Sequence, residues 1–256
     1  MASKTVLFIH GLYMTPLCWE EWVKRFEAKG YHCIAPAYPG RDKSVKELQT
    51  PEAALGKLTL SHIVDHLAKQ IATLGEKPVL IGHSMGALIA QLLLQRGLGS
   101  AAIAIDSAPP SGVFTTTFSF LKANWGHITP FVNQDSPVIM SFGRFQYAFV
   151  NGMPMDEQRA AFEKYVVPES RRIPRESLFS AKIDFRKPHA PLLIIAGGND
   201  HIIPSGLNKT NYKKYEDKSS VTDFKEFPGC NHFIIGQKGW EEVADCCLAW
   251  LAQQGK

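Results

Sequence analysis

The sequence predicts an α/β fold, with a mostly parallel sheet of about six strands and helices on both of its faces. The main reason is a set of short, uninterrupted apolar runs at 6–9, 79–81, 101–105 and 192–196, each ending at a glycine, proline or polar residue. Such runs are typical of strands that are buried on both faces, as in a parallel sheet. Helical patterns separate the runs, and this alternation favours right-handed strand–helix–strand units.

The other core elements have weaker patterns. Residues 31–35 and 224–227 are expected to form two further strands. Apolar stripes or terminating glycines mark helices through Trp19, Trp22, Val23 and Phe26 up to Gly30, over 87–95 up to Gly97, and through Trp240, Val243, Ala244, Cys247, Leu248 and Leu251. These elements complete a sheet that is covered on both sides.

The interval 109–187 interrupts this rhythm. It holds ten of the fifteen phenylalanines and contains no clear strand pattern. A structureless loop of this length is not expected inside a compact domain. We therefore predict an α/β core from residues 1–108 and 188–256, with 109–187 as an inserted, largely helical lid, or cap, over the edge of the sheet.

Composition narrows the function classes. The net charge is +4 and no run of five like charges occurs, so nucleic-acid binding is not expected. Only four consecutive apolar residues follow the N-terminus and no later run approaches a membrane span, so we expect a cytoplasmic protein without signal peptide or membrane span. The five cysteines lack metal-ligand or CxxC spacing, and reduced thiols are expected.

The segment IGHSMGA at 81–87 places Ser84 directly after an apolar strand and before a predicted helix. A sharp turn between a strand and a helix can expose a nucleophilic serine. Gly82 and Gly86 would let the strand and helix pack tightly around it. The Met85 amide starts the helix and is a ready oxyanion donor, and the Leu12 amide, after the first strand, is the expected second donor.

Further motifs in the chain give this serine a context. They are His10-Gly11 after the first strand, GHSMG at 82–86, GGND at 197–200 with Pro204 beyond it, and CNHF at 230–233. Together, and in this order, they resemble the α/β-hydrolase superfamily, in its serine esterase/lipase-like branch with a lid insertion. The resemblance covers both ends of the chain and gives no detail of 109–187.

The resemblance implies a catalytic role for three side chains: Ser84 as nucleophile, His232 as general base and acid, and Asp200 as the carboxylate that orients the histidine. It also implies an oxyanion hole made by the backbone amides of Leu12 and Met85. Asp200 and His232 both follow strands and are expected at the same sheet edge as Ser84. Asp106 also ends a strand and is the rival acid, but we favour Asp200.

Other polar residues near these motifs have simpler interpretations. His10 is expected to be structural, with its ring hydrogen-bonded in the oxyanion turn. His83 could line the pocket or merely pack, and Tyr13 is a further candidate pocket residue. His62 and His66 share a helix face but lack the glutamate of a zinc motif and a third ligand, so a solvated face is favoured. No metal and no cofactor are expected.

A serine nucleophile argues against the epoxide hydrolase and haloalkane dehalogenase branches, which form an ester on a carboxylate. We predict a carboxylesterase that cleaves small to medium apolar esters through an acyl-enzyme intermediate, with a small-molecule ester as its partner. The alternatives are a lactonase, a thioesterase, a hydroxynitrile lyase, a carbon–carbon bond hydrolase, and a ligand receptor of the same fold without significant turnover.

Overall fold

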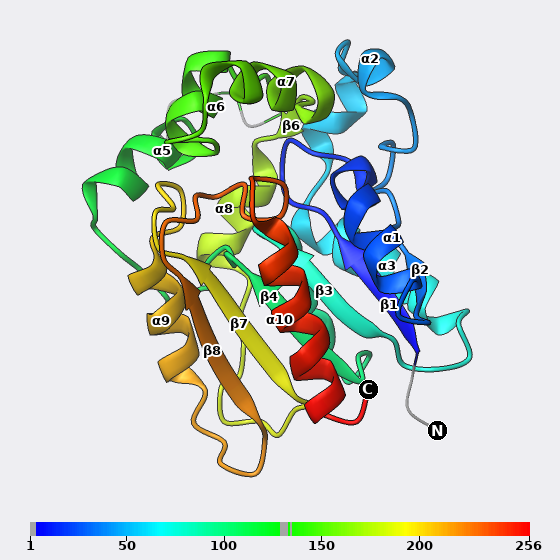
Figure 1. The fold of residues 1–256 in the computed structure, drawn as a ribbon. Helices are drawn as coiled ribbons and strands as arrows, with labels where there is room; N and C mark the ends of the chain where they lie inside the picture. Colours follow the sequence, from blue (N-terminus) through cyan, green and yellow to red (C-terminus); the bar gives the residue numbers. More distant parts are fainter. Residues whose placement is uncertain (1–3, 129–132, 134) are drawn as a thin grey trace.

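The computed structural model describes residues 4–128, 133 and 135–256. Its centre is a six-stranded parallel sheet in the order β2-β1-β3-β4-β7-β8 (Figure 1). The strands are β1 (Thr5–Ile9), β2 (His32–Ile34), β3 (Val79–His83), β4 (Ala101–Ile105), β7 (Leu192–Gly197) and β8 (Thr222–Phe227). The predicted α/β class and the parallel sheet of about six strands are confirmed.

The four apolar runs are the inner strands of this sheet. Every residue of β1, β3, β4 and β7 is buried, as expected for strands with helices on both faces. The register aligns Ile81 of β3 with Phe8 of β1 and Ile103 of β4. Strand β3 continues past the predicted end to His83, so the residue that follows it is Ser84.

Five longer helices cover the sheet: α1 (Glu20–Glu27), α3 (Leu60–Ala72), α4 (Met85–Gln95), α9 (Ser205–Lys214) and α10 (Trp240–Gln253). From β1 the chain first adds β2 on one side of it, and then adds β3, β4, β7 and β8 on the other side. Because the crossovers are right-handed, this change of direction places α1 on one face of the sheet and α3, α4 and α9 on the other. Helix α10 crosses the front of the sheet in Figure 1 and contacts α1, where Trp22 and Trp240 lie 6.0 Å apart between ring centroids.

Short elements connect these parts. They are the 3₁₀ helices η1 (Pro16–Trp19) and η2 (Ala53–Lys57) and the helix α2 (Val45–Leu48). No helix in the described parts of the chain has both the length and the apolar character that crossing a membrane requires.

Between β4 and β7 the described residues form four helices, α5 (Phe118–Ile128), α6 (Phe142–Ala148), α7 (Met155–Tyr165) and α8 (Arg172–Phe179). Helices α5, α6 and α7 lie above the carboxyl ends of the strands in Figure 1. The sequence showed no clear strand pattern in this interval, yet the structure has two short strands there. Strands β5 (Pro137–Val138) and β6 (Glu169–Ser170) pair antiparallel, but two residues each are too few to produce a periodic pattern.

Two glycines permit the close approach of β1, β3 and α4. A Cβ atom on Gly82 would lie 2.1 Å from the Gly86 carbonyl oxygen, and one on Gly86 would lie 2.1 Å from the carbonyl oxygen of Ile9. Both neighbours are backbone atoms, which cannot move away as a flexible side chain can. The two glycines of GHSMG are therefore needed for the packing of β1, β3 and α4, whatever chemistry Ser84 performs.

We expect Gly82→Ala to lower the free energy of unfolding by about 3 kcal/mol or more, because the new methyl group overlaps backbone atoms in a filled core. Equilibrium urea denaturation measures this change. Gly206→Ala is the matched control, since a Cβ atom there meets no heavy atom within 4 Å. Equal stability of the Gly82→Ala and Gly206→Ala proteins would contradict this account of the packing.

Candidate functional site

Ser84 occupies the sharp turn between β3 and α4. Its backbone angles are φ 57° and ψ −118°, a conformation that non-glycine residues rarely adopt and that costs on the order of 1–3 kcal/mol. Neighbouring strands hold the turn in place: the Ser84 amide donates to the Ile105 carbonyl at 2.9 Å, and the Ser84 carbonyl accepts from the Ala108 amide at 3.0 Å. The strain presents the Ser84 hydroxyl at the carboxyl edge of the sheet.

The structure brings Ser84, His232 and Asp200 together. The Ser84 hydroxyl and His232 Nε2 lie 2.9 Å apart, and His232 Nδ1 lies 2.6 Å from Asp200 Oδ2. All three residues are buried, with exposed fractions of 8%, 0% and 4% for Ser84, His232 and Asp200. A donor at Nδ1 leaves Nε2 as the acceptor for the serine proton, which is the tautomer that a general base needs.

Backbone amides fix the carboxylate of Asp200. Its Oδ1 accepts from the amides of Ile202 at 2.7 Å and Ile203 at 2.9 Å, and this leaves Oδ2 for the imidazole of His232. The ring of Phe149, at the end of α6, meets His232 edge-to-face at 4.9 Å between centroids. The imidazole is therefore held by a carboxylate on one side and by an aromatic ring on another.

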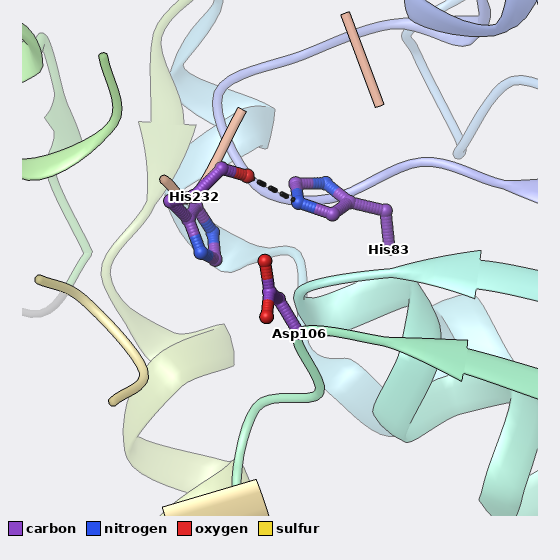
Figure 2. Close-up of side chains that lie close together, drawn as sticks. All are labelled: His83, Asp106 and His232. Atoms are coloured by element: carbon purple, nitrogen blue, oxygen red, sulfur yellow. Dashed lines mark hydrogen bonds between the residues drawn. The ribbon is translucent and has the colours of Figure 1, made fainter. Parts of the chain in front are cut away.

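The sequence left two roles open for His83, lining the pocket or packing. The structure favours packing, because His83 is buried and is not among the residues that line the cavity at Ser84. It ends β3 with its side chain in the core, fully buried, and Nε2–H donates to the His232 carbonyl at 2.8 Å (Figure 2). Burial, together with the nearby His232, holds the pKa of His83 well below its usual range. A neutral His83 therefore supports the backbone of His232 from below.

His10 is structural, as expected for the turn after β1. Its Nδ1–H donates to the Gly11 carbonyl at 2.9 Å, and the Tyr38 hydroxyl donates to the His10 carbonyl. Burial lowers the pKa of His10 to about 3, so the ring is neutral. The neutral ring stacks on Tyr38 at 3.8 Å between centroids, which fixes the loop that continues to Leu12.

Asp106, the rival acid, lies close to His232 but is differently bonded. Its Oδ1 accepts from the Gly197 amide at 2.6 Å, while the buried Oδ2 has no hydrogen-bond partner among the described residues. Burial raises the pKa of Asp106 well above its usual range, and the charge of Asp200 raises it further. The raised pKa favours the protonated, neutral form of Asp106, whereas Asp200 makes the hydrogen bond to the imidazole.

His83, Asp106 and His232 form a compact group (Figure 2). Each offers one atom that could bind a metal ion, and these three atoms lie within 4.8 Å of one another. A resident metal ion does not fit this group. Both nitrogens of His232 are already bonded, to Ser84 and Asp200, and a neutral carboxyl on Asp106 is a poor ligand. His62 and His66, the histidines that share a helix face, fit a metal ion no better, because His66 Nε2 is hydrogen-bonded to Gln70.

A buried clamp holds the loop that contains Leu12 and Tyr13. The Tyr13 amide donates to Glu169 Oε2 at 3.2 Å, and the Tyr13 carbonyl accepts from the Val167 amide at 2.9 Å. Arg41 Nη2 pairs with the same Glu169 oxygen at 2.7 Å, and both side chains are at most 1% exposed. The clamp thus joins the interval between β4 and β7 to the loop after β1, and it supports a backbone in which Tyr13 has φ 63°.

A cavity of about 670 Å³, including its open mouth, lies directly against Ser84. The core contributes Leu12, Tyr13 and Met85 to its wall, and the interval between β4 and β7 contributes Phe120, Met140, Arg144 and Phe149. Tyr13 thus lies at the cavity, as expected. Glu169, Arg41, Arg144 and Phe149 were not identified from the sequence, because isolated charged or aromatic residues outside the motifs carry no local signal.

The fold and this site place the chain in a known class. The profile of the Alpha/beta hydrolase family matches residues 6–246, which is most of the chain, and the protein belongs to this family. No curated protein matches the sequence with significant similarity.

Solved structures share the fold across nearly the whole chain. A monoacylglycerol lipase from Paleococcus ferrophilus aligns with a TM-score of 0.71 at 20% identity, covering 98% of this chain and 94% of its own. Polyneuridine aldehyde esterase aligns with a TM-score of 0.68 at 17% identity, covering 97% of this chain and 99% of its own. An extracellular α/β-hydrolase from a Paenibacillus species aligns with a TM-score of 0.70 at 21% identity, covering 96% of this chain and 98% of its own.

The two carboxyl groups near His232 can be separated by isosteric substitutions. We expect Asp200→Asn to lower kcat for ester hydrolysis by about 10,000-fold, because the amide favours the wrong imidazole tautomer. Asp106→Asn keeps the acceptor for the Gly197 amide and should retain most of the activity. Steady-state kinetics on both variants shows which aspartate orients His232. A larger loss of kcat in Asp106→Asn than in Asp200→Asn would assign this role to Asp106.

Asp106 also makes stability depend on pH. The raised pKa means that the folded protein holds the Asp106 proton to higher pH than the unfolded chain, which releases it above the ordinary value of 3.8. The stabilising contribution of this group is therefore lost as pH rises. The side-chain amide introduced by Asp106→Asn cannot ionise in either state. We therefore expect the Asp106→Asn protein to gain stability relative to wild type between about pH 4 and pH 7, measured by urea denaturation. A stability difference that does not change with pH would show that Asp106 is ionised in the folded protein.

Proposed function

We propose that this protein is a serine hydrolase that cleaves carboxylic esters of small to medium, mainly apolar substrates through an acyl-enzyme intermediate. The observation that carries the proposal is the continuous hydrogen-bonded chain from the Ser84 hydroxyl through His232 to Asp200. A serine hydroxyl is a weak nucleophile until a base takes its proton, and this arrangement provides the base and the group that orients it.

In the proposed reaction, Ser84 Oγ attacks the ester carbonyl carbon while His232 Nε2 takes the hydroxyl proton. The tetrahedral intermediate collapses, the bond to the alkoxy oxygen breaks, and His232 returns the proton to the leaving alcohol. Water then attacks the acyl-enzyme with His232 again as base, releasing the carboxylic acid and restoring the Ser84 hydroxyl. Atoms and charges balance without any cofactor.

The oxyanion of each intermediate needs hydrogen-bond donors, and we propose the backbone amides of Met85 and Leu12. Met85 is the first residue of α4, so its N–H has no acceptor within the helix and lies at the positive end of the helix dipole. Leu12 lines the cavity beside Ser84. One donor of this kind contributes about 3 kcal/mol to stabilising the transition state.

We further propose that residues 109–187 act as a lid, or cap, on a core made of 1–108 and 188–256. The cavity wall supports this division, because Phe120, Met140 and Phe149 of the interval line the same cavity as Ser84. Closing a lid over the ester would exclude water and strengthen the electrostatic interactions of the oxyanion. The lipase and esterase names among proteins of similar fold agree with ester chemistry.

We expect Ser84→Ala to abolish hydrolysis of p-nitrophenyl butyrate, lowering kcat by about a millionfold, because the nucleophile is lost. Ser219→Ala, on an exposed loop, is the control and should keep full activity. The same proteins are then assayed with lactones, thioesters, cyanohydrins and β-diketones, which test the lactonase, thioesterase, lyase and carbon–carbon hydrolase alternatives.

Wild-type turnover of the esters that exceeds turnover of all other substrates supports the proposal. Preference for another substrate class would replace the esterase with the corresponding enzyme. Tight ligand binding by wild type with negligible turnover of every substrate would indicate a receptor.

A further inference from the structure

One charged side chain stands out in the mostly apolar wall of the cavity at Ser84. Arg144 lies on α6 and shares the cavity with Ser84, Leu12 and Tyr13. Arg144 is half-buried, so its guanidinium keeps partial contact with solvent in the free protein. A wholly apolar substrate in this cavity would displace that water and leave the charge without a partner. The position of Arg144 therefore calls for a partner.

No carboxylate of the protein provides that partner. The structure describes every Asp and Glu of the chain, and none of them forms an ion pair with Arg144. Among the described residues, the side chain of Arg144 makes one hydrogen bond, from Nη2 to the Ala123 carbonyl at 2.7 Å. A guanidinium has five N–H donors, so most of its binding capacity is left for a ligand.

The charges around Tyr13, in the same cavity wall, also indicate that Arg144 is available to bind an anionic ligand. Burial raises the pKa of the Tyr13 hydroxyl, and the positive charges of Arg144, Arg171 and Arg41 oppose that rise. Glu169 is the single negative charge that acts on Tyr13, and it is already paired with Arg41. Arg144 therefore adds a positive charge at this end of the cavity with which no carboxylate of the protein forms an ion pair.

We propose that the natural substrate is an ester that also carries a carboxylate, and that Arg144 binds this carboxylate while Ser84 meets the ester carbonyl. The inference rests on the proposed esterase function and narrows its substrate class. A short apolar spacer between the two groups would lie against Phe149 and Met140 of the cavity wall. Arginine suits this role because its planar fork can bind both oxygens of a carboxylate.

The test compares half-esters of dicarboxylic acids with neutral esters of matched length: monoethyl succinate with ethyl butyrate, and monoethyl adipate with ethyl hexanoate. Each is assayed for ethanol release by wild type, Arg144→Met, Arg144→Lys and Arg159→Met. Arg159 is a matched control, because it is exposed on α7, stacks on Phe142 at 4.8 Å and lies outside the cavity wall.

We expect wild type to favour the half-esters, and Arg144→Met to lower their kcat/KM by about 10- to 100-fold while the neutral esters stay nearly unchanged. Arg144→Lys should retain part of the preference, and Arg159→Met all of it. The inference is overturned if Arg144→Met changes both kinds of ester equally, or if wild type favours the neutral esters.

Failure of the esterase function itself is recognised separately. If wild type hydrolyses none of these esters, binding of monoethyl adipate is measured by calorimetry in the Ser84→Ala protein, with and without Arg144→Met. Binding that disappears with Arg144→Met upholds the anion site although the proposed reaction fails. Absence of binding in the Ser84→Ala protein overturns the site as well.

Discussion

The backbone turn at Ser84 is the constraint on which the rest of the site depends. Its unusual conformation persists because β3, α4 and β1 meet at two glycines without room for a side chain. The same close approach brings the loop after β1 against the start of α4. Nucleophile position, helix terminus and oxyanion loop are therefore consequences of one packing arrangement, and a looser junction would displace all three together.

Three buried titratable groups around this turn have pKa values that favour their neutral forms. Burial holds the pKa values of His10 and His83 below, and that of Asp106 above, their usual ranges. Neutral neighbours leave the His232–Asp200 hydrogen bond as the main polar interaction at the imidazole. Positive charge is instead placed farther out, at Arg144, where it can act on a substrate. The site thus separates the group that moves a proton from the group that would select a ligand.

The sequence was sufficient for the sheet, because buried parallel strands leave uninterrupted apolar runs, and for the meeting of Ser84, His232 and Asp200, because each follows a strand at one sheet edge. It was insufficient where contacts are long-range and carry no local pattern. Strands β5 and β6 are too short for periodicity, and the Glu169 clamp joins residues 156 positions apart. The sequence could not decide between a packing and a pocket role for His83, because adjacency to Ser84 does not determine which way a strand residue faces.

The central claim is that Ser84 is the nucleophile and that His232 activates it. The most direct measurement is covalent labelling with a p-nitrophenyl alkylphosphonate, followed by mass spectrometry of the intact protein and of its peptides. One phosphonyl group should appear on the peptide that contains Ser84, and His232→Ala should slow its formation severely in the folded protein. Stoichiometric labelling of another residue, or an equal labelling rate without His232, would contradict the account.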